Sequence, residues 1–487
     1  MVTVDPLPVA GPDSPAVELF LERSAAVTAR APLTDTAEER AIVERLCRRL
    51  DGLPLAIELA AARTKALSPA ELDEQLRLRP GVLTDRQRTN ARHRSLTALI
   101  DWSHDDLDDP VRAAFRRLGV FRAAFTLDAA EQVLDEVGGP VAVDDVLVEL
   151  VERSLLRRYC DRSGTSRYQA LDAIRAFMLD RLAQAGEMNA AMAAHARWAA
   201  DFAERAEAGL RGPQEAAWAA AVHQQFDDLR AAVDWSIEAG SAEARRIAVA
   251  LQFYALWRGV SELFRWAERA AEALGVTDAS LAGATWAGAA SGAWQRGDLA
   301  RSRALLDAGS AAVTGVPSPL GRRRLAEVTA DLALLTGALD EAIVRYGEAR
   351  DLALAAGDVA QAVWDEASRA LAQAYGGAPS AALGTAASAL RLAKRAGAPS
   401  LVAYAHFAVA ESALGTDPAR ARRHLSAAAG AAATVGADYL VALQYGFPRP
   451  LCVPQPRRPF GLGPLRAPAD GGAHRVGARG WRSPCAR

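Results

Sequence analysis

The sequence predicts a mainly α-helical protein with one short β-hairpin and a C-terminal array of stacked helix pairs. Its 487 residues are 51% apolar but only 6% aromatic, which is typical of closely packed helices rather than of sheets. Apolar residues recur at three- and four-residue spacing through most of the chain. A chain of this length has room for about three domains of roughly 150 residues each.

A glycine and a proline separate two helices near the start of the chain. After a proline-rich linker, helices are expected from Ala16 to about Arg30 and over residues 35–50. Gly52 then stands where a helix end favours a positive φ, and Pro54 stands where the next helix tolerates a missing N–H. The glycine therefore stops one helix, and the proline starts the next.

A helical region followed by a hairpin predicts a winged helix. Beyond Thr89, four segments carry apolar residues at helical spacing. Two short runs then flank the polar stretch from Asp161 to Ser166, which contains Gly164 and is expected to form the turn of a β-hairpin. A further helix is expected over residues 172–185. This order of elements is typical of a winged helix-turn-helix domain.

Similar segments repeat along the last part of the chain. They align on glycines spaced 40, 40 and 38 residues apart, namely Gly297, Gly337, Gly377 and Gly415. Small residues recur where one helix crosses its neighbour, and a glycine marks each turn, as in helix pairs of the tetratricopeptide kind. Because that repeat has a period of about 34 residues, these units would be elongated. The sequence thus predicts an α-solenoid.

The final stretch differs in composition from the rest of the chain. It is rich in proline and arginine and has no glutamate or lysine, so we expect disorder. The abrupt change also fits a reading-frame change or a truncated gene product, which is a hypothesis. The expected segments are a linker (1–15), a helical subdomain (16–89), a winged helix (90–187), a helical connector (188–270), repeats (271–445) and a tail (446–487).

Charge and cysteine content point to an ordinary intracellular protein. The formal charge of −2 gives no overall attraction to nucleic acid or to an anionic membrane. The four cysteines show no CxxC spacing, so neither a zinc site nor a disulfide framework is expected. No signal peptide or membrane span is visible. We expect a cytoplasmic protein with no membrane partner.

Three successive segments resemble the bacterial AfsR/LuxR-type regulatory ATPases, which are signal-transduction ATPases with numerous domains (STAND). They are LCRRLDGLPLAIELAAAR, HRSLTALIDWSHDDLDDPVRAAFRRLGVFRAAFTLDAAEQV and LVERSLLRRYCDRSGTSRYQALDAIRAFMLDRLAQAGE. The resemblance runs from about Ser14 to about Trp266. It implies a switch in which an NB-ARC-type P-loop core, a helical subdomain, a winged helix and a repeat array hold ADP until a signal binds. It also implies that Gly52 and Pro54 contact the nucleotide, although helix stop and start explain these two residues without any ligand.

The residues that would hold phosphate are missing from this sequence. A P-loop has the form GxxxxGK[ST], and neither lysine of the chain, Lys65 or Lys394, follows a glycine. We therefore expect a chain without its own ATPase core, without a cofactor and without enzyme activity; ADP or ATP would bind in full-length relatives or in a longer parent protein. The Met-His-Asp triplet of plant relatives matches Ala170-Leu171-Asp172, which places Asp172 at the sensor position without the histidine.

The sequence contains no group of residues that is typical of a catalytic or metal-binding site. The seven histidines show no HExxH spacing, and no GxSxG motif occurs. Adjacent acids such as Asp105 and Asp106, or Asp227 and Asp228, are expected on solvent-facing helix surfaces. The tryptophans of the helical regions are expected to pack in cores rather than to form ligand sites. The sequence predicts no catalytic residue and no metal ligand.

The function that the sequence favours is regulation through protein contacts. Stacked helix pairs form an extended concave surface that suits a protein or peptide ligand, and the alternative is an array that only packs on its neighbours. The resemblance places such contacts in a transcription-regulating pathway. Two other functions stay open: DNA binding by the winged helix, and nucleotide binding if a longer parent chain exists.

Direct DNA binding is possible but not favoured by the charges of the winged helix. The helix at the recognition position carries four acids against one arginine, and this would repel phosphates: Asp144, Asp145, Glu149, Glu152 and Arg153. The wing carries arginines that could touch a DNA backbone, namely Arg157, Arg158, Arg162 and Arg167. A solvated hairpin explains these arginines equally well.

Overall fold

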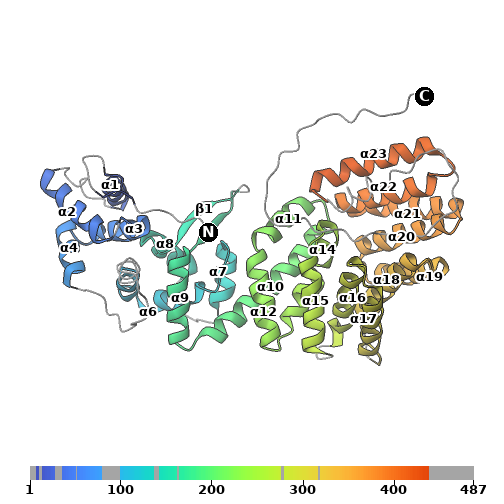
Figure 1. The fold of residues 1–487 in the computed structure, drawn as a ribbon, viewed down its shortest axis with the longest axis horizontal. Helices are drawn as coiled ribbons and strands as arrows, with labels where there is room; N and C mark the ends of the chain where they lie inside the picture. Colours follow the sequence, from blue (N-terminus) through green and yellow to red (C-terminus); the bar gives the residue numbers. More distant parts are fainter. Residues whose placement is uncertain are drawn as a thin grey trace.

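A computed structural model describes residues 7–9, 14–27, 36–50, 52–78, 99–135, 142–161, 164–275, 279–315 and 318–437. Within these ranges the protein is helical apart from one two-stranded antiparallel sheet, so the predicted fold class is confirmed. The elements follow one another along the long axis of the molecule, from α1–α4 at one end to the repeat helices at the other (Figure 1). The proline- and arginine-rich tail lies outside the described residues.

Four α-helices and a short 3-10 helix form the N-terminal subdomain. They are α1 (Pro15–Val27), α2 (Ala37–Arg49), α3 (Pro54–Ala62), η1 (Arg63–Lys65) and α4 (Pro69–Leu78). The side chain of Thr36 accepts a hydrogen bond from the N–H of Glu39 and caps α2. Fully buried Phe20, Leu46 and Ile57 bring the first three helices together into one core.

The winged helix follows after a helical stretch over residues 99–105. Its elements are α6 (Asp109–Leu118), α7 (Leu127–Leu134), α8 (Val143–Glu152), β1 (Arg157–Cys160), β2 (Ser166–Gln169) and α9 (Asp172–Gln184). The strands pair antiparallel from Arg157 opposite Gln169 to Cys160 opposite Ser166, which confirms the predicted hairpin. An isolated bridge between Phe125 and Tyr168 ties the hairpin to the segment before α7.

A helical connector joins the winged helix to the repeats. It comprises α10 (Met188–Leu210), α11 (Glu215–Gln224), α12 (Phe226–Glu238), α13 (Glu243–Ala250), α14 (Gln252–Arg258) and α15 (Ser261–Leu274). The connector reaches far along the repeat array. Arg211 pairs with Asp358 at 2.7 Å, and Glu215 accepts a hydrogen bond from the N–H of Ser400 at 2.9 Å. Trp257, 1% exposed, packs edge-on against Trp364 of the array, so α14 shares a core with the repeats.

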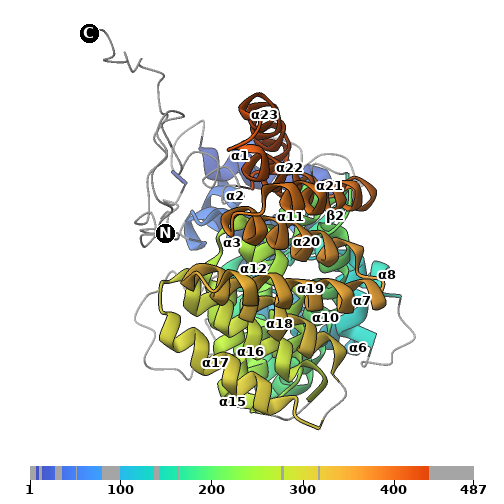
Figure 2. The same cartoon turned by 90° about the vertical axis from the view of Figure 1, so that its right-hand side faces the viewer.

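The repeats stack one above another in the end view (Figure 2). Their helices are α16 (Ala279–Gln295), α17 (Leu299–Ala312), α18 (Pro319–Thr336), α19 (Leu339–Ala355), α20 (Val359–Tyr375), α21 (Pro379–Ala396), α22 (Pro399–Ala413) and α23 (Pro418–Val435). Gly297, Gly337 and Gly377 have φ of +82°, +82° and +85° and turn the chain between paired helices, as predicted. Gly415 is not among the described glycines with positive φ, so this last turn is built differently.

No helix in the described residues is long and apolar enough to cross a membrane.

The even-numbered repeat helices α18, α20 and α22 are buried along most of their length, while α19, α21 and α23 keep one exposed face. The even-numbered helices therefore form the more buried layer of the array.

Candidate functional site

The turn between α2 and α3 is built as a helix stop followed by a helix start. Gly52 has a φ of +67°, and its N–H donates to the carbonyl of Cys47 at 3.0 Å. Pro54 is the first residue of α3. The backbone of Leu7 lies across this turn: its N–H donates to the carbonyl of Gly52 at 2.8 Å, and a Cβ on Gly52 would come within 2.3 Å of the Leu7 oxygen. Packing of the chain thus requires glycine here, and the predicted nucleotide contact is not needed to explain it.

Asp172, the residue at the predicted sensor position, begins α9. It is exposed and lies in the first turn, where a carboxylate is favoured by the N-terminal end of the helix dipole. One turn further, the Arg175 guanidinium Nε donates to the carbonyl of Phe121 at 2.7 Å. A structural role at the helix start accounts for Asp172, and its predicted sensor role stays a prediction.

Ion pairs connect the winged helix to the N-terminal subdomain. The Lys65 ammonium lies 2.8 Å from a carboxylate oxygen of Glu152 at the end of α8. Arg157 of β1 lies 3.2 Å from Glu58 of α3. Because exposed pairs contribute little stability individually, these two pairs add little to the stability of the contact between the two parts.

The recognition-position helix α8 presents acids to solvent. Asp144, Asp145 and Glu152 are exposed. Arg153, which directly follows α8, pairs with Asp106 at 2.6 Å and with Glu149 of α8 at 2.9 Å. The surface that would face a DNA major groove is therefore negative, in agreement with the charge argument from the sequence.

The described part of the wing offers little free positive charge. Arg167 pairs with Asp161 at 3.0 Å, and both side chains are largely buried. Arg158 donates to the hydroxyl of Ser166 at 3.0 Å and is exposed. Arg162 lies outside the described residues. Of the three wing arginines that are described, two are neutralised by carboxylates.

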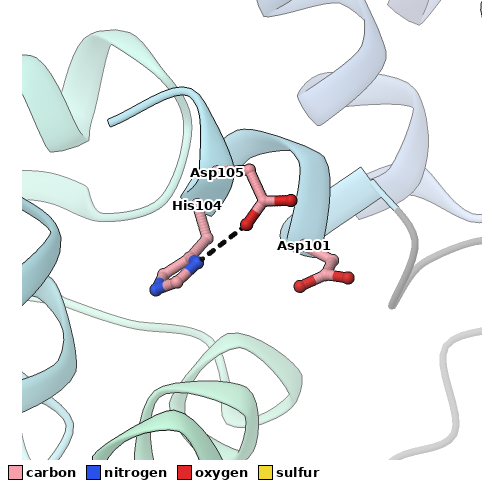
Figure 3. Close-up of side chains that lie close together, drawn as sticks. All are labelled: Asp101, His104 and Asp105. Atoms are coloured by element: carbon pink, nitrogen blue, oxygen red, sulfur yellow. Dashed lines mark hydrogen bonds and ion pairs between the residues drawn. The ribbon is translucent and has the colours of Figure 1, made fainter. Parts of the chain in front are cut away.

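One group of potential metal ligands occurs in the described part of the chain: Asp101, His104 and Asp105 (Figure 3). His104 Nδ1 lies 3.4 Å from Asp105, while the ring packs edge-on against Phe177. Burial lowers the pKa of His104. Arg181 donates a hydrogen bond to Asp101 and already supplies a positive charge there. Ion pairing of Asp101 and packing of the His104 ring therefore account for this group on the helical stretch 99–105 without a metal ion.

A buried carboxylate that the sequence did not reveal joins the winged helix to the connector. Asp228 of α12 is 0% exposed, so the expectation of a solvent-facing position was wrong for this residue. It accepts hydrogen bonds from the backbone N–H groups of Arg122 and Ala123 at 2.7 and 2.9 Å, and His195 Nε2 lies 3.0 Å away. The neighbouring Asp227 is largely exposed, as expected.

Comparison with known proteins supports the winged-helix part of this architecture. A family model described as a winged helix-turn-helix domain matches residues 107–183. A Mycobacterium tuberculosis (strain H37Rv) protein named "Putative HTH-type transcriptional regulator Rv0890c" is 37% identical over 261 residues, which are 51% of this chain and 28% of that protein. "Uncharacterized protein Rv0894" of the same strain is 38% identical over 184 residues, 37% of this chain and 45% of that protein.

A solved structure of similar outline is a STAND protein with a tetratricopeptide repeat sensor from Pyrococcus horikoshii. It has 13% sequence identity, a TM-score of 0.48, and covers 88% of this chain and 62% of that chain. The chain spans less than half the length of the curated relatives named above. The element order, the hairpin and the family match together establish that residues 107–183 form a winged helix-turn-helix domain.

Proposed function

We propose that this chain is a regulatory part of a transcription-regulating signalling protein and that it acts through protein contacts of its repeat array. The observation that carries the proposal is the charge of the winged helix. Its recognition-position helix exposes acids, and Arg153 and Arg157 are paired with Asp106 and Glu58. A winged helix with this surface serves better as a packing module than as a DNA reader.

The proposed assignment of the chain to one protein family rests on the sequence resemblance. We propose that the chain belongs to the AfsR/LuxR-type STAND proteins, in which Gly52 and Pro54 would face ADP or ATP supplied by a P-loop core. That core would have to come from a longer parent protein, because GxxxxGK[ST] does not occur in this sequence. The chain itself would then neither hydrolyse ATP nor hold a cofactor.

Exposed apolar side chains allow the array and the winged helix to be tested separately. Val344 and Leu354 of α19 are 67% and 44% exposed, and Val148 and Tyr159 of the winged helix are 54% and 47% exposed. A strain lacking the gene would be complemented with Val344→Glu/Leu354→Glu or with Val148→Glu/Tyr159→Glu, and transcripts would be compared by sequencing. Surface changes of this kind cost little stability, which circular dichroism would verify.

We expect the array variant to fail in restoring the transcript profile and the winged-helix variant to restore it. The opposite pattern would place the regulatory contact on the winged helix and contradict the proposal. Restoration by both variants would likewise contradict a contact through the outer face of α19.

DNA binding by the winged helix is the second candidate, because the matched domain family is a helix-turn-helix family. A mobility-shift assay of the full chain with a random-sequence duplex pool at low salt tests it. We expect no retained DNA, since phosphate contacts need unpaired cations. Tight retention that weakens steeply with salt would refute the charge argument.

A further inference from the structure

The last three described helices of the array carry an excess of positive charge. Residues 379–437, which span α21, α22 and α23, contain six lysines or arginines against two acids. The preceding residues 1–378 have the opposite balance, with 43 basic residues against 55 acids. These three helices form the end of the array that lies away from α1–α4 (Figure 1). The array therefore ends in a basic region that follows an acidic chain.

The six cations of this region have no carboxylate partner among the described residues. In contrast, the guanidinium groups of Arg350 and Arg369, on the two preceding helices, lie 3.0 and 3.5 Å from the carboxylate of Glu366. Five of the six unpaired side chains are exposed and one is half-buried. They belong to α21 and α23 and are here called the basic face: Arg391, Lys394, Arg395, Arg420, Arg422 and Arg423.

The two acids of the same region make other contacts. Glu411 accepts a hydrogen bond from the hydroxyl of Tyr375 at 3.1 Å. Asp417 caps α23, where its carboxylate accepts from the backbone N–H of Arg420 at 2.9 Å. Neither carboxylate forms an ion pair with a cation of the basic face, so the positive charge of this face is not neutralised from within the region.

A pair of histidines lies between the cations of the two helices. Nδ1 of His406 on α22 is 2.8 Å from Nδ1 of His424 on α23, and α22 packs against both α21 and α23. Burial lowers the pKa of both rings, and the positive charge of Lys394 on α21 acts in the same direction on both. Arg420 and Arg423 lower the pKa of His424 as well. Cations of α21 and α23 thus gather around one pair of rings.

Unpaired like charges on neighbouring helices repel one another, so the basic face is unfavourable in the free chain. An anionic partner would replace this repulsion with attraction. Each exposed ion pair contributes little alone, but several together give a salt-dependent affinity and speed the encounter with a partner of opposite charge. The basic face is therefore suited to a partner that carries several negative charges close together.

Nucleic acid fits this surface less well than protein does. Duplex DNA carries one negative charge per about 1.7 Å of its axis, and α21, with 18 residues, is about 27 Å long. A duplex longer than the basic face would therefore meet the acidic chain that precedes it. Single strands bind by stacking their bases on aromatic side chains, but the two aromatic rings of α21–α23 are buried, with Tyr404 and Phe407 5% and 4% exposed. A short acidic segment of protein avoids both problems.

A second copy of this chain is also a poor match for the basic face. Glu149 and Glu152 of its acidic helix α8 already pair with basic side chains at 2.9 and 2.8 Å. Asp144 and Asp145 remain on that helix, which gives two acids against six cations. A segment of another protein with several acids close together matches the charge better.

We propose that the basic face docks a short segment, rich in aspartate and glutamate, of another protein. The segment lies across α21 and α23, with its carboxylates on the six cations and near the histidine pair. This gives the partner of the repeat array a chemistry, and it rests on the proposed regulatory function only in assuming that the array acts through protein contacts. The basic face is separate from the exposed apolar residues of α19.

Fluorescence anisotropy with the full chain tests the proposal with three labelled probes. The first is a twelve-residue peptide of alternating glutamate and serine, the second has glutamine in place of each glutamate, and the third is a random-sequence DNA duplex longer than the basic face. We expect the glutamate peptide to bind with an affinity that falls as salt is raised. The glutamine peptide should bind at least about tenfold more weakly, and the duplex should not bind.

Two double variants of the array make a matched pair. Arg420→Glu/Arg423→Glu reverses two charges of the basic face and should weaken binding of the glutamate peptide at least about tenfold. Arg303 and Arg322 are also exposed and have no carboxylate partner among the described residues, but they lie on α17 and α18. Arg303→Glu/Arg322→Glu should therefore change binding less than about threefold at physiological salt. Circular dichroism verifies each fold, and Arg391→Glu/Lys394→Glu replaces the first variant if it does not fold.

Four results would overturn the proposal. The first is no binding of the glutamate peptide. The second is an equal effect of the two double variants, which would mean attraction to positive charge anywhere on the chain, the arginines of residues 446–487 included. The third is duplex binding that Arg420→Glu/Arg423→Glu removes, which would make the basic face a nucleic-acid surface. The fourth is self-association in light scattering that the same variant removes, which would make the occupant a second copy.

The test of the basic face and the test of the proposed function can fail separately. The complementation experiment changes Val344 and Leu354 of α19, which are not part of the basic face. If those variants restore the transcript profile while the glutamate peptide binds, the proposed function fails and the docking surface stands. If they do not restore it and the peptide does not bind, the array regulates through a contact of different chemistry.

Discussion

Replacing Asp228 with asparagine should loosen the junction between the winged helix and the connector. The carboxylate, which is 0% exposed, accepts from two backbone N–H groups, those of Arg122 and Ala123, and contacts the fully buried His195. Asparagine has one acceptor oxygen in place of two, so its amide N–H₂ must face at least one of these donors. Asp227→Asn on the same helix is the matched control, because that side chain is 65% exposed.

The size of the effect follows from these contacts. One buried donor left unpaired costs about 1–3 kcal/mol, and the hydrogen bonds that survive each lose roughly 1 kcal/mol when the acceptor is no longer charged. The sum is about 2–5 kcal/mol for Asp228→Asn. Asp227→Asn breaks only an exposed pair with Arg230, at 2.7 Å, and should cost less than about 1 kcal/mol.

Hydrogen–deuterium exchange is the suitable assay because a chain with several domains need not unfold in one step. In Asp228→Asn, the amides of Arg122 and Ala123 should exchange at least about 30-fold faster, the equivalent of about 2 kcal/mol. The same amides should be little changed in Asp227→Asn. Equal exchange in the two variants would refute the conclusion that the buried carboxylate holds this junction.

Three further changes test other parts of the structure. Gly52→Ala should destabilise the N-terminal subdomain by roughly 1–3 kcal/mol, because alanine at a φ of +67° is strained and its Cβ meets the Leu7 oxygen; unchanged exchange in α2 and α3 would contradict this. Burial raises the pKa of Asp331 to about 7, so the folded array binds a proton that the unfolded chain releases, and stability should fall as pH rises from about 4 to about 7. In thermal denaturation measured across this pH range, Asp331→Asn should show a smaller decrease in stability with rising pH. A pH profile equal to that of the unmodified chain would contradict the raised pKa of Asp331. Burial and the facing His424 lower the pKa of His406 to about 4. The unfolded chain therefore binds a proton that the folded protein does not, and the stability of the fold should fall as pH falls from about 6.5 to about 4. His406→Gln should reduce this loss of stability in the same thermal denaturation experiments.

Much of the architecture could be predicted because it depends on local patterns. The stop at Gly52 and the start at Pro54 follow from backbone geometry alone, and the structure has both. The glycines at 297, 337 and 377 lie at the turns that their spacing indicated, and they have positive φ. Gly415 shows the limit, since a glycine permits such a turn without requiring it.

The candidate sites were much harder to predict. Asp227 and Asp228 are adjacent and chemically identical. Only Asp228 is buried, because α12 packs there against residues 122–123 and against His195. The small residues Ala231 and Ala232, which are buried beside it, were the one local sign of a second contact face. Trp294 and Trp364 occupy ordinary helical positions, and they line one small pocket only because the connector packs against the repeats.

The sequence by itself determined the order and type of the elements, the acidic character of the recognition-position helix and the absence of a P-loop motif, because these depend on residue identity and short-range spacing. Tertiary structure decided which charges are paired and which carboxylate is buried. These properties arise between residues far apart in the chain, such as Arg211 and Asp358, and no local pattern encodes the distance between them.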